Sequence, residues 1–230
     1  MKRTPETGIK IIRIRRTKGL AEYTVRSGRY TSILDALEEI RNESEPGLLY
    51  RHSCHHGSCG TCSVIANGKR VLACLTRLNE LEGPIELHPL SPFPVVGDLA
   101  IDPAPLYRDF PREASYLRPS EANPEAVVPE EIAGFVRFEN CIECGLCVSA
   151  CPVQERFMGP AALAAWNREL EKRPDREAEI LEATSGPAGA PGCDRALRCS
   201  AVCPLGVYPA KHIAQLLKRI EGRRGKERGG

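Results

Sequence analysis

Eleven cysteines fall into three groups, and their spacing constrains this chain more than any other feature of its 230 residues. The first group has the spacing C-x4-C-x2-C-x11-C and consists of Cys54, Cys59, Cys62 and Cys74. The second has the spacing C-x2-C-x2-C-x3-C-P and consists of Cys141, Cys144, Cys147 and Cys151. The third has the spacing C-x5-C-x3-C-P and consists of Cys193, Cys199 and Cys203. The three groups use every cysteine, which predicts sets of metal ligands rather than isolated thiols.

The spacings indicate iron–sulfur clusters. The first is that of a plant-type 2Fe–2S cluster, and the second is that of bacterial ferredoxins with two clusters. The third group is the same bacterial run with one cysteine missing, because Ala196 stands where a thiol would be needed. The chain is therefore predicted to carry electrons.

The bacterial run also predicts which cysteines share a cluster, because its fourth cysteine ligates the other cluster of the pair. The predicted 4Fe–4S ligands are Cys141, Cys144, Cys147 and Cys203. The second site is left with Cys151, Cys193 and Cys199. Three thiolates with the methyl group of Ala196 at the fourth corner predict a 3Fe–4S cluster.

Structural zinc and disulfides are the alternatives. Zinc sites need four ligands, commonly as two C-x2–4-C pairs, whereas here three ligands come in one C-x2-C-x2-C run and the last set has only three sulfurs. Disulfide frameworks belong to small secreted domains without a core, whereas 42% hydrophobic residues supply a core here. Met1 leads into Lys2 and Arg3 without an apolar segment, so no signal peptide is expected. Reduced thiols that hold metal are favoured.

Composition argues against two classes of function. The net charge of +2 is too small to suggest nucleic-acid binding. No apolar run is long enough to predict a membrane span. The length predicts two domains of about 100 residues each.

The N-terminal third is predicted to be a β-grasp 2Fe–2S ferredoxin domain. Strands are predicted at 9–16 and 22–26, a helix at 33–42 with Ser32 as its N-cap, a hairpin of 63–66 and 70–73 around Asn67-Gly68, and a last strand at 85–88. Gly57 and Gly60 lie in the cysteine loop, where positive φ would turn backbone amides toward the sulfurs. His52, His55 and His56 suggest a Rieske centre, in which two His replace two Cys. All four cysteines are present, so we expect these histidines to be surface or interface residues.

The remainder is predicted to be an α-helical ferredoxin domain of the bacterial type, which makes the whole chain α+β. The segment from Leu90 to Pro129 is rich in proline and is expected to be irregular, with a short helix near 106–110. Further helices are predicted at 160–173, at 175–183 and from Pro209 through Ile220, and a flexible loop at 184–192. The predicted domains are 1–100 (β-grasp), 101–128 (connector), 129–222 (4Fe–4S/3Fe–4S) and 223–230 (a basic, disordered tail).

With the cysteines and domains in this order, the chain resembles the iron–sulfur subunits of the succinate dehydrogenase/fumarate reductase family over its whole length. The segments that carry the resemblance are Cys54-His-His-Gly-Ser-Cys-Gly-Thr-Cys62, Pro94-Val-Val-Gly-Asp-Leu-Ala-Ile-Asp102, Cys141-Ile-Glu-Cys-Gly-Leu-Cys-Val-Ser-Ala-Cys-Pro152, Phe157-Met-Gly-Pro-Ala-Ala162 and Cys199-Ser-Ala-Val-Cys-Pro204. The family's cluster ligands coincide with those predicted above.

The resemblance implies partners and a location. It implies a flavoprotein subunit with FAD, where succinate and fumarate interconvert, and a membrane anchor that binds quinone. The chain would then lie on the cytoplasmic side of the cell membrane, held there by its partners. The 2Fe–2S cluster would face the flavin and the 3Fe–4S cluster the quinone, and no catalytic residue is predicted in this subunit.

Two departures favour the fumarate reductase type. Succinate dehydrogenases often carry paired tryptophans after the Cys-Pro that corresponds to Cys151-Pro152, where this chain has Val-Gln-Glu-Arg-Phe. They also tend to place His after the cysteine that corresponds to Cys193, where this chain has Asp194.

Two other functions remain open from the sequence. One is the relay subunit of a soluble fumarate reductase that uses thiol cofactors or a heterodisulfide. Such relatives typically carry a second complete 4Fe–4S set, which Ala196 argues against. The other is a free-standing ferredoxin or redox sensor. A sensor would need an exposed thiol outside the clusters, and no cysteine is left over.

Overall fold

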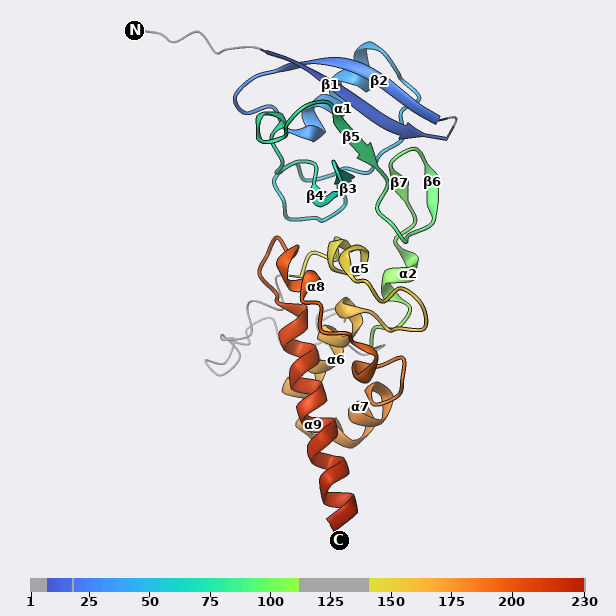
Figure 1. Cartoon of the computed structure of the whole chain (residues 1–230), viewed down its shortest axis with the longest axis vertical. Coiled ribbons are helices and arrows are strands. Elements are labelled where there is room, and N and C mark those ends of the chain that lie inside the picture. The colour runs from blue at the N-terminus through green and yellow to red at the C-terminus, as the bar shows by residue number, and fades with distance from the viewer. Residues whose placement is uncertain (1–7, 18, 112–140, 230) are drawn as a thin grey trace, which may run out of the picture. The chain divides into compact units, whose positions relative to one another are not determined.

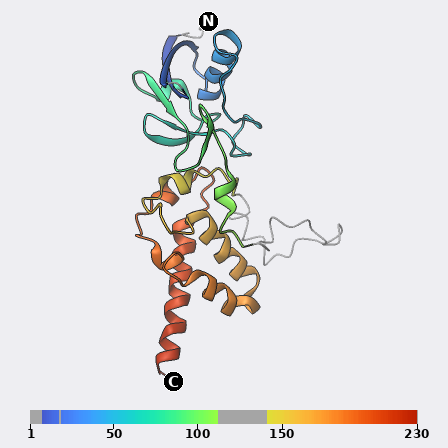
Figure 2. The same ribbon diagram turned by 90° about the vertical axis from the view of Figure 1, so that its right-hand side faces the viewer.

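The computed structural model describes residues 8–17, 19–111 and 141–229, which form two compact units (Figures 1 and 2). The first unit comprises Met1–Pro105 together with Ile142–Ser149. The second comprises Leu106–Cys141 and Ala150–Gly230. The second run of cysteines is thus divided, because Cys144 and Cys147 belong to the first unit.

The first unit is built on a five-stranded sheet with the order β2-β1-β5-β3-β4. Its strands are β1 (Gly8–Arg16), β2 (Gly19–Ser27), β3 (Ser63–Ala66), β4 (Lys69–Leu72) and β5 (Ile85–His88). Strand β1 pairs antiparallel with β2 and parallel with β5. Helix α1 (Ile33–Glu43) and the cysteine loop come between β2 and β3. This mixed sheet with its helix is the β-grasp arrangement, so the predicted fold class is confirmed.

Local sequence explains the helix and its position. Ser32 forms a capping box with Asp35, since its hydroxyl accepts a hydrogen bond from the Asp35 amide at 3.1 Å and the Asp35 carboxylate accepts one from the Ser32 amide at 2.8 Å. The apolar residues of α1 share one face and are buried, namely Ile33, Leu34, Ala36, Leu37 and Ile40. The alternating isoleucines Ile12 and Ile14 of β1 are fully buried. The predicted cap, helix and strands are confirmed.

A small hairpin contradicts the expectation that the chain becomes irregular at Leu90. Strands β6 (Val95–Gly97) and β7 (Ala100–Ile101) pair antiparallel. A short 3₁₀ helix, η1 (Leu78–Glu80), lies earlier in the chain, between β4 and β5. Asp98 at the hairpin tip is buried and accepts hydrogen bonds from Arg16 Nε at 3.0 Å and from the Leu49 amide at 3.0 Å. These long-range bonds order a proline-rich segment that local propensity leaves undefined.

The second unit is helical. Its elements are α6 (Pro160–Lys172), η3 (Pro174–Arg176), α7 (Glu177–Thr184), η4 (Ala190–Gly192), α8 (Arg198–Ala201) and α9 (Pro209–Gly229). Two short helices straddle the division of the chain, α2 (Ala104–Tyr107) and α5 (Leu146–Ala150). Helices α6, α7 and α9 bury a shared core that includes Leu163, Ile180 and Leu216. The predicted helices are present: α6 and α7 lie within two residues of their expected bounds, whereas α9 continues beyond Ile220.

Three expectations in or beside the helical unit are wrong in detail. The tail is not disordered through 223–229, because α9 continues to Gly229. Arginine, lysine and glutamate are good helix formers, and Arg223 and Arg224 bond the Ala178 and Ser185 carbonyls at 3.1 and 3.2 Å. Residues 184–192 are not a single flexible loop: Thr184 ends α7, the Gly189 amide donates to the Gly186 carbonyl at 2.9 Å, and η4 follows with Ala190 buried. The short helix begins at Ala104 rather than near 106.

The predicted connector lies mostly outside the described residues. In the described part of the chain, no helix combines the length and the apolar character that a bilayer crossing requires.

Candidate metal centres

The first cysteine group lies in a loop and a hairpin of the first unit. Cys54, Cys59 and Cys62 precede β3, and Cys74 follows β4. The Ala73 amide donates to the Cys62 carbonyl at 3.0 Å, so the hairpin brings the last two cysteines together. Their sulfur atoms lie 3.4 Å apart. All four thiols belong to one compact unit, as the spacing predicts.

Glycines shape this loop. Gly57 and Gly60 have φ of +81° and +70°, a region that L side chains rarely adopt. The turn at Gly57 directs the amides of Ser58 and Cys59 to the Cys54 sulfur, each at 3.3 Å. Hydrogen bonds to the sulfurs are one of the ways a protein sets the potential of a cluster. The expected role of the glycines is confirmed for Gly57.

The thiols of this loop differ in how readily they ionise. Hydrogen bonding by Ser58, helped by the amides of His56 and Cys59, lowers the pKa of Cys54 to about 5. Burial raises the pKa of Cys62 to about 12. Thiolates are the form that binds metal. The Cys54 thiol therefore ionises readily, whereas the buried Cys62 thiol must lose its proton as metal binds.

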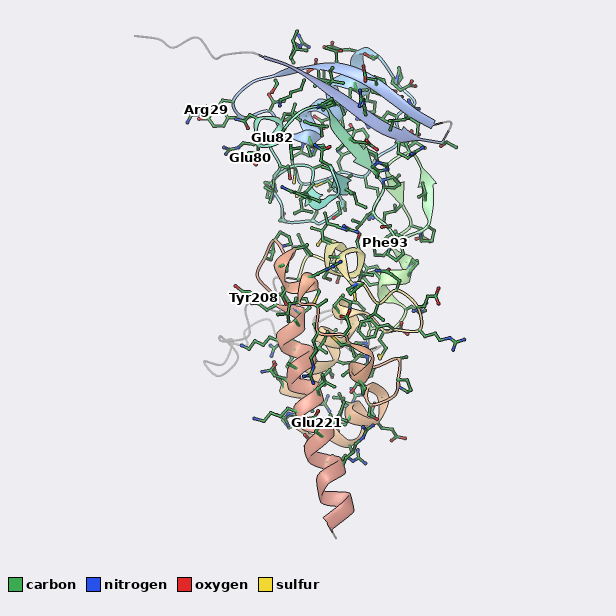
Figure 3. The ribbon with its side chains drawn as sticks, in the orientation of Figure 1. Arg29, Glu80, Glu82, Phe93, Tyr208 and Glu221 are labelled. Atoms are coloured by element: carbon green, nitrogen blue, oxygen red, sulfur yellow. The ribbon has the colours of Figure 1, made fainter. Side chains whose placement is uncertain are left out.

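The segment with Cys144 packs directly on this loop. A Cβ atom on Gly60 would lie 2.3 Å from the Ile142 carbonyl oxygen and 2.9 Å from Cys144 Cα, so only glycine fits there. A Cβ atom on Gly145 would likewise lie 2.9 Å from the ring of Phe93, which is labelled in Figure 3. Arg70 Nε donates to Ser149 Oγ at 3.3 Å. Within the first unit, the loop of the first cysteine group therefore packs on the backbone of the segment that carries Cys144.

A second group of thiols meets in the helical unit. Cys151, Cys193 and Cys199 line one small pocket, together with Ala196 and the core residue Phe157. Burial raises the pKa of both Cys151 and Cys199, and the neighbouring thiols add to the effect. The pocket brings Cys151 to residues more than forty positions later in the chain. This is the juxtaposition that the crossover rule predicts.

Backbone amides also point at sulfurs in this unit. The Arg195 amide lies 3.4 Å from the Cys193 sulfur, and the Val207 amide lies 3.4 Å from the Cys203 sulfur. Arg195 and Leu197 have positive φ, which turns the chain around Ala196. Cys141 and Cys203 belong to this unit and are half-buried.

The spacing of the sulfur atoms fits clusters better than zinc. Zn–S bonds of about 2.3 Å place neighbouring sulfurs of a tetrahedral site about 3.8 Å apart. Among the described residues, no three cysteine sulfurs all lie within 4.8 Å of one another. The thiols of Cys151, Cys193 and Cys199, which line a shared pocket, suit a 3Fe–4S or 4Fe–4S cluster, in which each cysteine sulfur binds a different iron.

The structure adds contacts that the sequence analysis missed. The close approach of Gly60 to Ile142 and Cys144 joins residues that no local pattern connects, and glycine in a cysteine loop was the only available signal. Asp98 was also missed, although the Pro94–Asp102 segment was singled out for its resemblance. Of the loop histidines, His55 and His56 are exposed and His52 is half-buried, as expected of surface residues.

Comparison with known proteins agrees with this geometry. Residues 8–108 match the family of 2Fe-2S iron-sulfur cluster binding domains, and residues 137–207 match the 4Fe-4S dicluster domains. The chain is 32% identical to the fumarate reductase iron-sulfur subunit of Haemophilus influenzae, over 94% of this chain and 93% of that protein. It is also 32% identical to the succinate dehydrogenase iron-sulfur subunit of Paracoccus denitrificans, over 80% and 74%.

A solved structure has the same fold. A chain of the Mycobacterium smegmatis Sdh1 complex in the apo form superposes with a TM-score of 0.80 at 27% identity, over 94% of this chain and 97% of that one. These similarities confirm the predicted family, the two ferredoxin-type domains and the iron–sulfur cofactors. Which cysteine binds which cluster stays a prediction. The chain belongs to the family of succinate dehydrogenase/fumarate reductase iron–sulfur subunits, the electron-transfer subunits of those oxidoreductases.

Proposed function

We propose that the chain relays single electrons between an FAD-containing subunit and a quinone site at a membrane anchor. The pocket lined by Cys151, Cys193, Cys199 and Ala196 is the observation that carries the proposal. Three thiols with a methyl group at the fourth corner suit a 3Fe–4S cluster, and the soluble thiol-linked alternative would call for a fourth thiol there. The family relationship supports the partners and a peripheral position on the cytoplasmic side of the membrane.

The ligand sets follow the cysteine spacing. We assign the 2Fe–2S cluster to Cys54, Cys59, Cys62 and Cys74. We assign the 4Fe–4S cluster to Cys141, Cys144, Cys147 and Cys203. We assign the 3Fe–4S cluster to Cys151, Cys193 and Cys199. The 3.4 Å separation of the Cys62 and Cys74 sulfurs suits neighbouring ligands of one iron.

The protein's own part in the relay is to hold and insulate these groups. Bound clusters each accept and give one electron at a time, which links two-electron chemistry at flavin and quinone. The amides of Ser58 and Cys59 donate to a ligand sulfur on one side of the loop. Phe157, a residue of the buried core, lines the Cys151 pocket, and Cys151 and Cys193 pack against that core. The close approach of Gly60 to Cys144 holds Cys144 against the loop of the first cysteine group.

Anaerobic purification of the complex through a tag on this chain tests the proposal. We expect a flavoprotein and a membrane subunit to co-purify, and succinate to reduce both an added quinone and an artificial dye. Cys151→Ala should abolish quinone reduction while the dye, which can take electrons at the flavin, is still reduced. Purification of the chain alone, or electron transfer to thiol cofactors in place of quinone, would contradict the proposal.

A further inference from the structure

We infer that Glu38, His52 and His55 form a binding site for a divalent cation of the zinc class, separate from the cysteine centres. Glu38 lies on α1, and the two histidines lie in the loop that leads into the first cysteine group. All three belong to the first unit. The ligating atoms of the three side chains lie within 4.8 Å of one another, which is the property that the cysteine sulfurs lack.

The distances match a tetrahedral site. His52 Nδ1 and His55 Nε2 are 3.3 Å apart, and Glu38 Oε1 lies 3.5 Å from His55 Nε2 and 4.0 Å from His52 Nδ1. Zinc bonds to imidazole and carboxylate are about 2.0–2.2 Å long, so neighbouring ligand atoms of a tetrahedral site lie about 3.3–3.6 Å apart. Two of the three edges agree already, and the third needs a shift of a few tenths of an ångström.

The donor set selects the kind of ion. Two imidazoles and one carboxylate are the protein ligands of open zinc sites, where water occupies the fourth position. Imidazole suits zinc, copper and nickel, whereas magnesium and calcium prefer sites made of oxygen. The side chains of His52, His55 and Glu38 are 28%, 43% and 32% exposed, so an ion can enter from solvent.

The surrounding residues hold the site in place. The Tyr50 ring lies against His52 with centroids 5.2 Å apart, and Arg41 covers the same tyrosine at 5.1 Å. The rings of His52 and His55 meet edge to face at 86°, so they are not stacked on one another. A helix and a braced loop therefore supply the three donors from fixed positions.

The other histidines provide a contrast within the same chain. His56 is engaged locally, with its ring nitrogens at the Cys54 carbonyl and at Ser58 Oγ. His88 pairs with the single carboxylate of Glu86. His212 lies in the other unit, on α9. Two histidines converge on one carboxylate only at the Glu38 site in the part of the chain that the structure describes.

A bound ion would act on the neighbouring centre. His55 follows Cys54 directly, so an added positive charge there would favour the reduced form of a 2Fe–2S cluster and raise its midpoint potential. This consequence rests on the proposed function, whereas binding of the ion does not.

Zinc binding to the anaerobically purified, cluster-loaded protein tests the inference. Equilibrium dialysis with Zn²⁺ should reveal one site, and each of Glu38→Gln, His52→Gln and His55→Gln should weaken it at least tenfold, in line with the loss expected when a metal site is disturbed. The matched controls, His56→Gln and His88→Gln, should leave the affinity unchanged. X-ray absorption at the zinc edge should show nitrogen and oxygen ligands without sulfur.

Several results would overturn the inference. These are no stoichiometric zinc binding, binding that the three variants leave intact, and sulfur in the zinc shell. In the first two cases the three side chains would be a hydrogen-bonded, ion-paired cluster only. The midpoint potential of the 2Fe–2S signal with and without Zn²⁺ then tests the electrostatic consequence. Absence of that EPR signal altogether would count against the proposed function, while the dialysis result would still decide the cation site.

Discussion

The two cysteine sites differ in how the chain brings their members together. In the first unit, Cys54, Cys59, Cys62 and Cys74 come from one loop and one hairpin. In the second unit, the pocket takes Cys151 from one end of the domain and Cys193 and Cys199 from beyond α6 and α7. Closing a longer loop costs more chain entropy, and metal binding is coupled to folding. The site of Cys151, Cys193 and Cys199 should therefore depend on its cluster for structure more than the site in the first unit.

The largest expected effect is that of losing a cysteine ligand from each of the two sites. Cys151→Ala should abolish the 3Fe–4S signal and also lower the thermal midpoint of the helical unit, because a distant connection is lost. Cys59→Ala, the matched change in the first unit, should remove the 2Fe–2S signal with a smaller loss of midpoint. EPR and circular dichroism at 222 nm measure the two effects. If Cys151→Ala damaged only the 4Fe–4S signal, the crossover of ligands would be wrong.

A change of cluster type is the next effect in size. Ala196→Cys would add a fourth thiol to the pocket of Cys151, Cys193 and Cys199. We expect the 3Fe–4S signal to give way to that of a second 4Fe–4S cluster on reduction. Ala201→Cys places a thiol on the exposed side of α8 and is the control. An unchanged spectrum in Ala196→Cys would argue against the register of Cys193 on the bacterial run.

The packing of the first cysteine loop should be sensitive to a side chain at Gly60. Gly60→Ala combines a positive φ, which costs about 1–2 kcal/mol for an L residue, with a Cβ contact of 2.3 Å to the Ile142 carbonyl oxygen. We expect a loss of about 3 kcal/mol in the free energy of unfolding of the first unit. Gly68→Ala has a similar φ of +78° but nothing within 4 Å, so it isolates the backbone cost. Equal losses in the two variants, measured by thermal unfolding, would show that the contact with Ile142 does not matter.

The second unit should also lose stability in mild acid. Burial lowers the pKa of His212 to about 4, and its Nδ1 accepts a hydrogen bond from Asn167 Nδ2 at 2.9 Å. The unfolded chain takes up a proton near its ordinary pKa of about 6.5, which the folded form resists, so stability falls as the pH drops below that value. We expect a loss of about 1–2 kcal/mol between pH 7 and pH 5.

His212→Gln should flatten this pH dependence, whereas the surface change His88→Gln should not. Circular dichroism at 222 nm during thermal unfolding reports the helical unit. A pH dependence that His212→Gln leaves unchanged would assign the acid sensitivity to other groups.

The same contrast between local and distant contacts explains what the sequence could predict. The capped helix α1, the Asn67-Gly68 hairpin and the alternating Ile12 and Ile14 are local patterns, and all three are found as expected. The β6–β7 hairpin depends on bonds from Arg16 and Leu49 to Asp98, which no window of sequence contains. The prediction of a disordered tail was wrong. Its glycines and charges indicated disorder, but Arg223 and Arg224 donate to the carbonyls of Ala178 in α7 and of Ser185.

The candidate sites show the same contrast between local patterns and distant contacts. Cysteine spacing predicts which thiols form the 2Fe–2S group because those ligands are nearly consecutive. The meeting of Cys151 with Cys193 and Cys199 could be predicted only through the known crossover of bacterial runs. Glu38 beside His52 and His55 has no signature in the sequence, because a helix and a loop supply the donors separately.

Low-temperature EPR of the anaerobically purified complex tests the central claim most directly. The account predicts that the oxidised protein shows the signal of a 3Fe–4S cluster, that this signal vanishes on reduction with dithionite, and that signals of reduced 2Fe–2S and 4Fe–4S clusters replace it. An intact protein that is silent when oxidised and shows two reduced 4Fe–4S signals would contradict the account and favour a relay that does not use quinone.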